Sequence, residues 1–305
     1  ELLRHWKGSR LPARRASECA REVIHLLALR ACMGVYSHAV AYENCTINIG
    51  DGIVIVVTGA SSGIGHAVAA ALAQRGLPVL AVARSQEPLR ELVDRFPTLI
   101  RAVAADLSRQ DGIESVLAAV EPNVAVYGIV HSAGSRVTPE SYQSINTEAL
   151  IEHFRIHVAS QIRLYQTMTT KVSIARMLFI DSYSASQPRD GWGAYSITKS
   201  ASQMAARCAA QELSDTITIR VLPGAVRTGV VESVIASGTK TADVFQDLDK
   251  AGKVVAPEAV ADFITGILVN TTDEMLRSIQ AWDYNNLEHR TLVQSAKDRV
   301  NHSSQ

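Results

Sequence analysis

A tyrosine and a lysine four residues apart, Tyr195 and Lys199, fall at the start of a predicted helix over 194–213. The spacing places both side chains on one face of that helix. A phenol is a poor base at neutral pH, but a nearby ammonium group and a cationic nicotinamide ring both lower the pKa of a phenol. Ser182 precedes Tyr195 by thirteen residues, at the carboxyl end of a predicted strand. Its hydroxyl could hold a carbonyl oxygen against the tyrosine proton while hydride reaches the carbon, so the three residues predict a hydride-transfer site.

A glycine-spaced turn at 58–65 is the second chemical signal. It follows the apolar run 53–57, which is typical of a strand buried on both faces, and it opens a predicted helix over 64–75. Glycines let backbone N–H groups approach a pyrophosphate, although a glycine-rich turn before a helix also occurs for structural reasons alone. The position between a strand and a helix favours a dinucleotide site. Its candidate cofactor contacts are Gly59, Ser61, Ser62, Gly63, Ile64 and Gly65.

The end of the second predicted strand, 79–83, indicates which dinucleotide binds. Sites that prefer NAD carry a carboxylate there for the ribose 2′-hydroxyl. This chain has Arg84 instead, whose charge suits a 2′-phosphate, and we therefore expect NADP as cofactor. The alternative is a solvated arginine that binds nothing. Asp106 and the Leu107 backbone are expected to contact the adenine, unless Asp106 only caps the helix after it.

Strands and helices alternate along the chain, which predicts an α/β class fold: a doubly wound parallel sheet, or Rossmann fold, with the cofactor at the carboxyl ends of the strands. We expect a single domain over 52–285, an N-terminal extension over 1–51 that is partly disordered or helical, and a frayed polar tail over 286–305. The segment 224–253 is expected to form a loop with short helices that closes over substrate. Further strands are expected at 99–104, 124–130, 177–181, 216–222 and 276–281, and further helices at 110–120, 148–169 and 257–270.

Composition argues against several classes of function. The 305 residues include 30 basic and 30 acidic side chains, so charge gives no reason to expect a nucleic acid or a membrane surface as partner. No apolar run approaches the roughly 20 residues that cross a bilayer. The four cysteines have neither metal-ligand spacing nor the density of a disulfide scaffold, so we expect no metal and a reducing compartment, the cytoplasm. The arginine-rich residues 1–51 leave a mitochondrial location open.

The chemical motifs resemble those of the short-chain dehydrogenase/reductase family over residues 52 to about 285. The matching segments are Thr58–Gly65, Ser182, Tyr195–Lys199 and Pro223–Thr228. The resemblance implies NADP-dependent reduction of a small carbonyl compound, with Tyr195 as acid/base, Lys199 on the nicotinamide ribose and Ser182 orienting the substrate. It also implies a homodimer or homotetramer. Contacts at the nicotinamide end of the cofactor are implied for Pro223, Gly224, Val226 and Thr228.

Two shorter stretches, Asp190–Tyr195 and Ala281–Tyr284, are similar to the NADPH-dependent benzil reductase and sepiapterin reductase-like members of this family. This second similarity implies a dicarbonyl or an aromatic ketone as substrate. Trp192 and Tyr183 are candidate aromatic walls for such a substrate, and each could equally be a packing residue.

The chain departs from the family at three polar positions. The family has Asn-Asn-Ala-Gly where this chain has His131 followed by Ser132, Ala133 and Gly134, three small residues that we expect to keep the cofactor contact. His157 aligns with a catalytic asparagine that, in the family, helps hold a water connecting the lysine to solvent. An imidazole there could relay the proton or break the relay. The departures leave two alternatives open: a dinucleotide-binding sensor or scaffold without turnover, and an enzyme that oxidises an alcohol with NAD.

Overall fold

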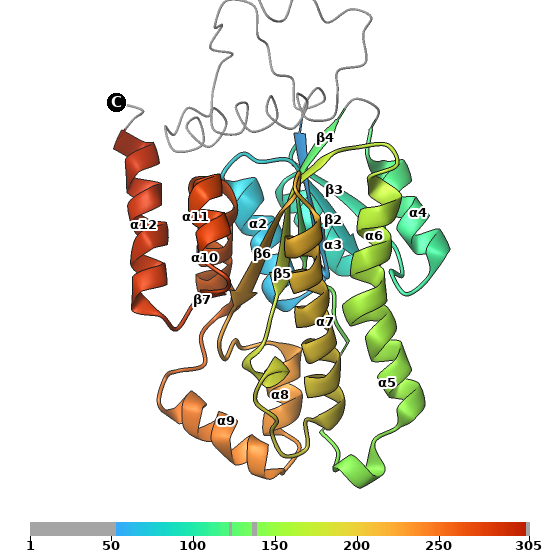
Figure 1. Ribbon diagram of the computed structural model, residues 1–305, viewed down its shortest axis with the longest axis vertical. Coiled ribbons are helices and arrows are strands. Elements are labelled where there is room, and N and C mark those ends of the chain that lie inside the picture. Colours follow the sequence, from blue (N-terminus) through green and yellow to red (C-terminus); the bar gives the residue numbers. More distant parts are fainter. Residues whose placement is uncertain (1–52, 122–123, 136–138, 303–305) are drawn as a thin grey trace, which may run out of the picture.

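The computed structural model describes residues 53–121, 124–135 and 139–302, which form a seven-stranded parallel sheet with helices on both faces (Figure 1). The strand order is β3-β2-β1-β4-β5-β6-β7, so the chain builds one half of the sheet outward from β1 and then crosses to build the other half from β4. The predicted doubly wound fold is confirmed. The strands are β1 (Ile53–Thr58), β2 (Val79–Ala83), β3 (Ile100–Ala104), β4 (Ala125–His131), β5 (Ile174–Ile180), β6 (Ile217–Leu222) and β7 (Trp282–Asp283).

Most positions of the central strands are apolar because both of their faces are buried. Along β1, Ile55 and Val57 contact one hydrophobic cluster while Val56 contacts the other, and all three are at most 1% exposed. One cluster is covered by α2 (Gly63–Gln74), α3 (Gln86–Arg95), α10 (Pro257–Asn270), α11 (Asp273–Ser278) and α12 (Leu287–His302). The other is covered by α4 (Gln110–Ala119), α6 (Ser160–Met168) and α7 (Gly193–Glu212).

The predicted helix over 148–169 has a change of winding in its middle. It consists of α5 (Thr147–Phe154), one turn of π-helix over Arg155–Ala159, and α6. A π-turn holds one more residue than an α-turn and occurs frequently at functional sites. His157 lies within it.

The segment after β6 carries two short helices, α8 (Gly229–Ile235) and α9 (Lys240–Lys250), which lie beyond the carboxyl ends of the strands (Figure 1). Val231 and Val234 of α8 and Phe245 of α9 are buried in a third apolar cluster. This agrees with the expectation of a loop with short helices over 224–253.

Two sequence expectations differ from the structure, and one helix was not expected. The predicted strand at 276–281 is wrong, because the side chain of Thr272 accepts the Met275 N–H and caps helix α11 there, and the edge strand β7 follows it. Residues 287–302 form helix α12 instead of a frayed tail, because Val293 packs on Gly266 of α10 and is only 6% exposed. Helix α3 was not anticipated at all.

The predictions for residues 1–51 lie outside the described residues. Among the helices that the structure describes, none combines the length and the apolar character that crossing a bilayer requires.

Candidate active site

The carboxyl ends of β1, β4, β5 and β6 open into one cavity of about 960 Å³. Such a position at the strand ends, where the strand order reverses between β1 and β4, is where doubly wound sheets bind ligands. The glycine turn, the end of β4, Ser182, the start of α7 and the segment after β6 all contribute to its walls. The predicted site residues that line it are Gly59, Ser61, Ser62, Gly63, Ile64, Ser132, Ala133, Gly134, His157, Ser182, Tyr195, Lys199, Pro223, Gly224, Val226 and Thr228.

The glycine turn leaves no room for side chains. Gly59 has φ +69°, and a Cβ built on it would lie 2.7 Å from the Ser132 carbonyl oxygen. A Cβ on Gly65 would approach the Gly59 carbonyl oxygen to 2.5 Å, which keeps the start of α2 against the turn. The result is a bare backbone cradle at the N-terminus of a twelve-residue helix, which fits the pyrophosphate of a dinucleotide.

Thr58 joins the ends of β1 and β4. Its Oγ1 donates to the Val130 carbonyl and accepts the N–H groups of Ser132 and Ala133, each at 3.1 to 3.2 Å. Next to them the ring of His131 stacks on Phe179 at 4.7 Å between centroids. Burial lowers the pKa of His131 to about 3, so its imidazole is neutral. The small residues that follow His131 are thus held by backbone contacts that do not need the asparagine side chains usual in the family.

Ser182, Tyr195 and Lys199 come together as the sequence predicts. Ser182 lies two residues after the end of β5 and caps the short 3₁₀ turn Tyr183–Ala185, its Oγ accepting the Ser184 N–H at 3.2 Å. The Tyr195 ring packs edge-on against Trp192, at 4.7 Å between centroids. Lys199 is buried, and its Nζ lies 5.9 Å from the centre of the Tyr195 ring while it donates to the Ile180 carbonyl at 2.9 Å.

The electrostatics of this trio differ from the sequence expectation. Burial raises the pKa of Tyr195 to about 12, more than the hydrogen bond from Ser182 lowers it. Burial also lowers the pKa of Lys199 to about 8, and the charge of Asp181 opposes that change. The protein alone therefore keeps the phenol protonated. In this environment Tyr195 is set up to donate a proton.

His157 faces the same cavity from the π-turn. Its ring lies against Gly134, where a Cβ would be 2.8 Å from the histidine Cε1. Its Nε2 accepts the Ser135 N–H at 3.3 Å, and the Ser135 hydroxyl also bonds His153 Nδ1. Burial lowers the pKa of His157 well below its ordinary value, and the charges of Lys199 and His153 add to this. The imidazole is therefore neutral.

The adenine end of the predicted cofactor site lies at the ends of β2 and β3, outside the walls of the cavity. Arg84 directly follows β2 and is exposed. Asp106 accepts the N–H and the hydroxyl of Ser108, at 3.0 and 2.8 Å, and the cap of α4 is Arg109. Asp106 therefore does not cap that helix. The side chain of Leu107 is buried in the core.

Phe245 and His153 were not singled out by the sequence, whereas Trp192 and Tyr183 were candidate aromatic walls. Trp192 is parallel to Phe245 of α9 at 5.6 Å, which builds an aromatic wall from two distant segments. Tyr183 donates to the Asp283 carboxylate instead of standing free in the cavity. A signal existed for His153, which precedes His157 by four residues on one helix face, and none for Phe245.

The family model described as short chain dehydrogenase matches residues 53–238, the segment that carries the turn, the trio and most of the cavity walls. The chain belongs to the short-chain dehydrogenase family. The chain is thus an oxidoreductase of a family that binds a nicotinamide dinucleotide.

Two relatives illustrate where the chain lies within the short-chain dehydrogenases. It is 25% identical to a benzil reductase ((S)-benzoin forming) of Bacillus cereus over 70% of this chain and 93% of that protein. It is 30% identical to a sepiapterin reductase of Xenopus laevis over 63% of this chain and 79% of that protein. Both names denote reductases and fit carbonyl reduction in general.

A solved structure, a closed form of serine dehydrogenase complexed with NADP⁺, superposes with a TM-score of 0.63 at 19% identity. The match covers 77% of this chain and 98% of that one. At this identity the likeness bears on the fold.

Proposed function

We propose that the protein is an NADP-dependent carbonyl reductase in which Tyr195 donates the proton. The observation that carries the proposal is the cavity itself, because one space is lined by the glycine cradle and by Ser182, Tyr195 and Lys199. When bound, the cofactor would supply hydride to the carbonyl carbon. Ser182 holds the carbonyl oxygen, and Tyr195 transfers its proton to that oxygen as negative charge develops on it. Lys199, charged at neutral pH, binds the ribose and replaces the proton.

Arg84 supports NADP as the cofactor. It is exposed at the end of β2, and its charge lowers the pKa of Asp106, so it lies close to the expected adenine position. Arg84→Asp should raise the Kd for NADPH by about tenfold or more and improve NADH binding, because it replaces a partner of the 2′-phosphate by one of the 2′-hydroxyl. Arg90→Asp on helix α3 is the matched control. An unchanged preference in Arg84→Asp would rule out this role.

The aromatic wall supports an aromatic or dicarbonyl substrate. Trp192 and Phe245, together with Val231 and Leu248, make the part of the cavity beyond Tyr195 apolar. The direct test follows NADPH absorbance with a panel of diketones and aromatic aldehydes. Tyr195→Phe should reduce the rate at least a hundredfold. Tyr165→Phe, which removes a phenol on α6 outside the cavity, should leave it unchanged.

A second proposal concerns the proton supply. His157 takes the place of the family's asparagine, and the Ser135 hydroxyl lies between His153 Nδ1 and His157 Nε2, 3.4 Å from the latter. We propose that this His–Ser–His series passes a proton from His153 toward Lys199. His157→Phe should lower the reduction rate about tenfold. His157→Asn should retain more activity, since it restores the family's residue, and equal loss in both variants would contradict the relay.

The alternative is a dinucleotide-binding sensor or scaffold, favoured by Ser132 and His157 at positions where the family has asparagines. It predicts NADPH binding without reduction of any carbonyl in the panel. Intact Ser182, Tyr195 and Lys199 favour the enzyme, because a binding protein has no use for a perturbed lysine beside a buried phenol.

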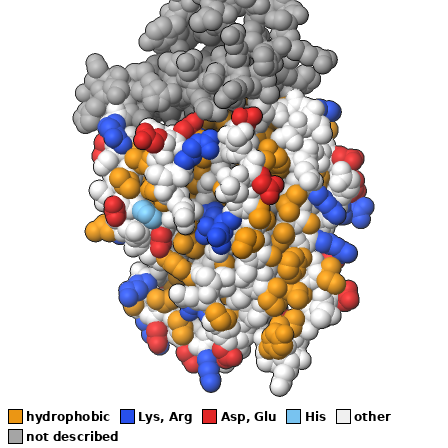
Figure 2. Space-filling model, viewed as in Figure 1, with side chains coloured by type: hydrophobic (Ala, Val, Ile, Leu, Met, Phe, Trp, Pro, Cys, Tyr) orange, Lys and Arg blue, Asp and Glu red, His pale blue; other side chains and the backbone are white. Residues whose placement is uncertain are grey.

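We also propose a homodimer or homotetramer. Four large apolar side chains are 39–51% exposed on α5, α6 and α7, where Figure 2 shows hydrophobic surface gathered along one side of the molecule. The side chains are Ile151, Ile162, Ile197 and Met204. Light scattering should give a multiple of 32.9 kDa, and Met204→Glu should shift it toward the monomer.

A further inference from the structure

Asp181 is a buried carboxylate beside the catalytic residues that the proposed mechanism does not use. Its side chain is 2% exposed, and it stands between Ile180, whose carbonyl accepts Lys199 Nζ, and Ser182. Burying a carboxylate costs free energy unless hydrogen bonds or an opposite charge offset the loss of its hydration. The partners of Asp181 therefore indicate its role.

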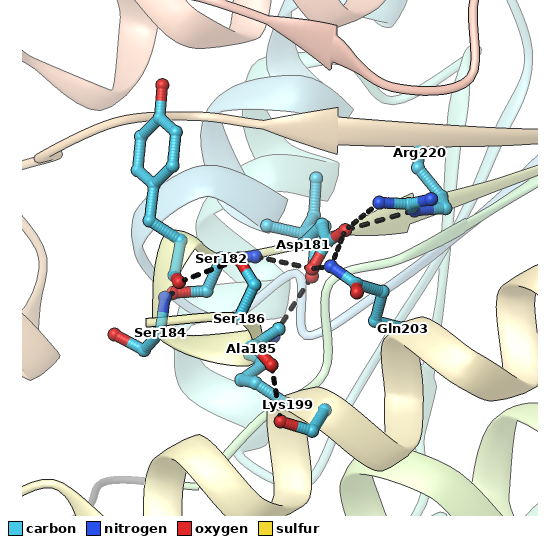
Figure 3. A network of polar contacts seen from close by, with 11 residues as sticks. Asp181, Ser182, Ser184, Ala185, Ser186, Lys199, Gln203 and Arg220 are labelled. Carbon is cyan, nitrogen blue, oxygen red and sulfur yellow. Dashed lines mark hydrogen bonds and ion pairs between the residues drawn. The ribbon is translucent and has the colours of Figure 1, made fainter. Parts of the chain in front are cut away.

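Those partners come from three directions. Arg220 of β6 donates to Asp181 Oδ2 through Nε and Nη2, both at 3.0 Å. Gln203 of α7 donates through Nε2, at 3.1 and 3.3 Å to the two carboxylate oxygens. The Ser182 N–H donates to Oδ1 at 2.7 Å. Figure 3 shows the arginine and the glutamine converging on this carboxylate.

The network fixes two catalytic elements at once. Gln203 lies one helical turn after Lys199, so its bond to Asp181 holds that part of α7 against the end of β5. The bond from the Ser182 N–H sets the direction of the backbone that carries the Ser182 hydroxyl. Catalytic groups need this kind of support because small displacements lose large factors in rate.

The network also places a fixed negative charge near the reacting phenol. The charge of Asp181 raises the pKa of Tyr195 and that of Lys199. Its titratable neighbours are Arg220 on β6 and Tyr195 and Lys199 on α7, and the adjacent strand β4 ends in the neutral His131. A negative charge here favours the neutral phenol of Tyr195 and the ammonium form of Lys199, which are the protonation states that carbonyl reduction requires.

We propose that Asp181, held by Arg220 and Gln203, is a positioning residue that orients Ser182 and keeps Tyr195 in its proton-donating form, so that the site favours reduction over oxidation at neutral pH. The proposal rests on the proposed function for the reaction, but its electrostatic part can be measured without any substrate.

The test follows the ionisation of Tyr195 by the tyrosinate absorbance difference between the full chain and its Tyr195→Phe variant. In an Asp181→Asn background the midpoint should move to lower pH by about half a unit or more, because one nearby negative charge is lost. Asp273→Asn is the matched control, since it removes the acid paired with another buried arginine, Arg176, near the start of β5. The control should leave the midpoint unchanged.

The kinetic arm measures kcat/KM for carbonyl reduction against pH. The fall of kcat/KM at high pH should begin at a lower pH in Asp181→Asn than in the wild type. If Asp181 had a purely structural role, the substitution would lower kcat/KM by the same factor at every pH. If Asp181→Asn does not fold because Arg220 is left without its acid, the double variant Asp181→Asn/Arg220→Gln removes both charges. The midpoint should then move in the same direction but by less, because the positive charge of Arg220 is lost as well. An unmoved Tyr195 midpoint in a folded variant overturns the inference, whereas a moved midpoint without carbonyl reduction would contradict only the proposed function.

Discussion

The buried lysine gives a stability prediction that needs no substrate. The folded chain lowers the pKa of Lys199 from 10.5 to about 8, so between these values the unfolded chain binds more protons than the folded one. Unfolding free energy from this group therefore rises with pH across that window. Relative to an unshifted lysine, Lys199 lowers the free energy of unfolding by about 3 kcal/mol at pH 7 and by about 1.4 kcal/mol at pH 9.5. The folded protein should therefore gain about 2 kcal/mol of stability between these two pH values.

The assay compares urea unfolding of the wild type and Lys199→Met at pH 7 and pH 9.5. The variant has lost the titrating group, and its other groups are the same, so the wild type should gain about 2 kcal/mol relative to it over this range. Tyr195 contributes little here, since its pKa and that of a free phenol both lie above the range. Lys171→Met, which removes an exposed ammonium, is the control. An equal difference between Lys199→Met and wild type at both pH values would refute the reasoning.

Two further predictions concern packing. Gly59→Ala should lose more than about 2 kcal/mol of unfolding free energy and bind NADPH at least tenfold more weakly, because the new Cβ meets backbone that must move. Gly76 also has a positive φ, +74°, but has open space around it, so Gly76→Ala should lose only about 1 kcal/mol and bind NADPH normally. Denaturation and fluorescence titration measure both effects, and equal behaviour of the two variants would show that the cradle is not tight. In α12, Val293→Ala should lower the free energy of unfolding by about 2 kcal/mol, because Val293 is buried. Leu287 is 68% exposed, so Leu287→Ala should lower it by less than about 0.5 kcal/mol. Similar values for the two variants in urea unfolding would mean that the helix is not part of the core.

The parallel strands could be predicted because burial on both faces leaves runs of apolar residues, such as 53–57 in β1 and 177–180 in β5. Helix α12 was missed because its buried set is a narrow stripe, Val293 and Ala296, in a polar sequence. Helix α11 carried its own start signal, a capping Thr272 before two acidic residues, which the apolar positions at 276–281 outweighed in the prediction.

At the site, residue types and spacing were enough to place the trio around one cavity. The direction of the Tyr195 pKa was not predictable, because burial outweighs the neighbouring charges and burial depends on tertiary packing. The same holds for the contacts of Asp181, whose partners come from residues 22 and 39 positions away along the chain.

The π-turn over Arg155–Ala159 lets the parts of one long helix before and after it point their side chains in different directions. Each residue of an α-helix advances the side chain by about 100°, so the additional residue rotates everything before it relative to everything after it. Leu164 and Met168 can therefore face the sheet while His157 faces the cavity. Inserting or deleting a residue in this turn would therefore rotate α5 about its axis. A single deletion would take the imidazole of His157 away from the cavity, even though every neighbouring residue type stayed the same.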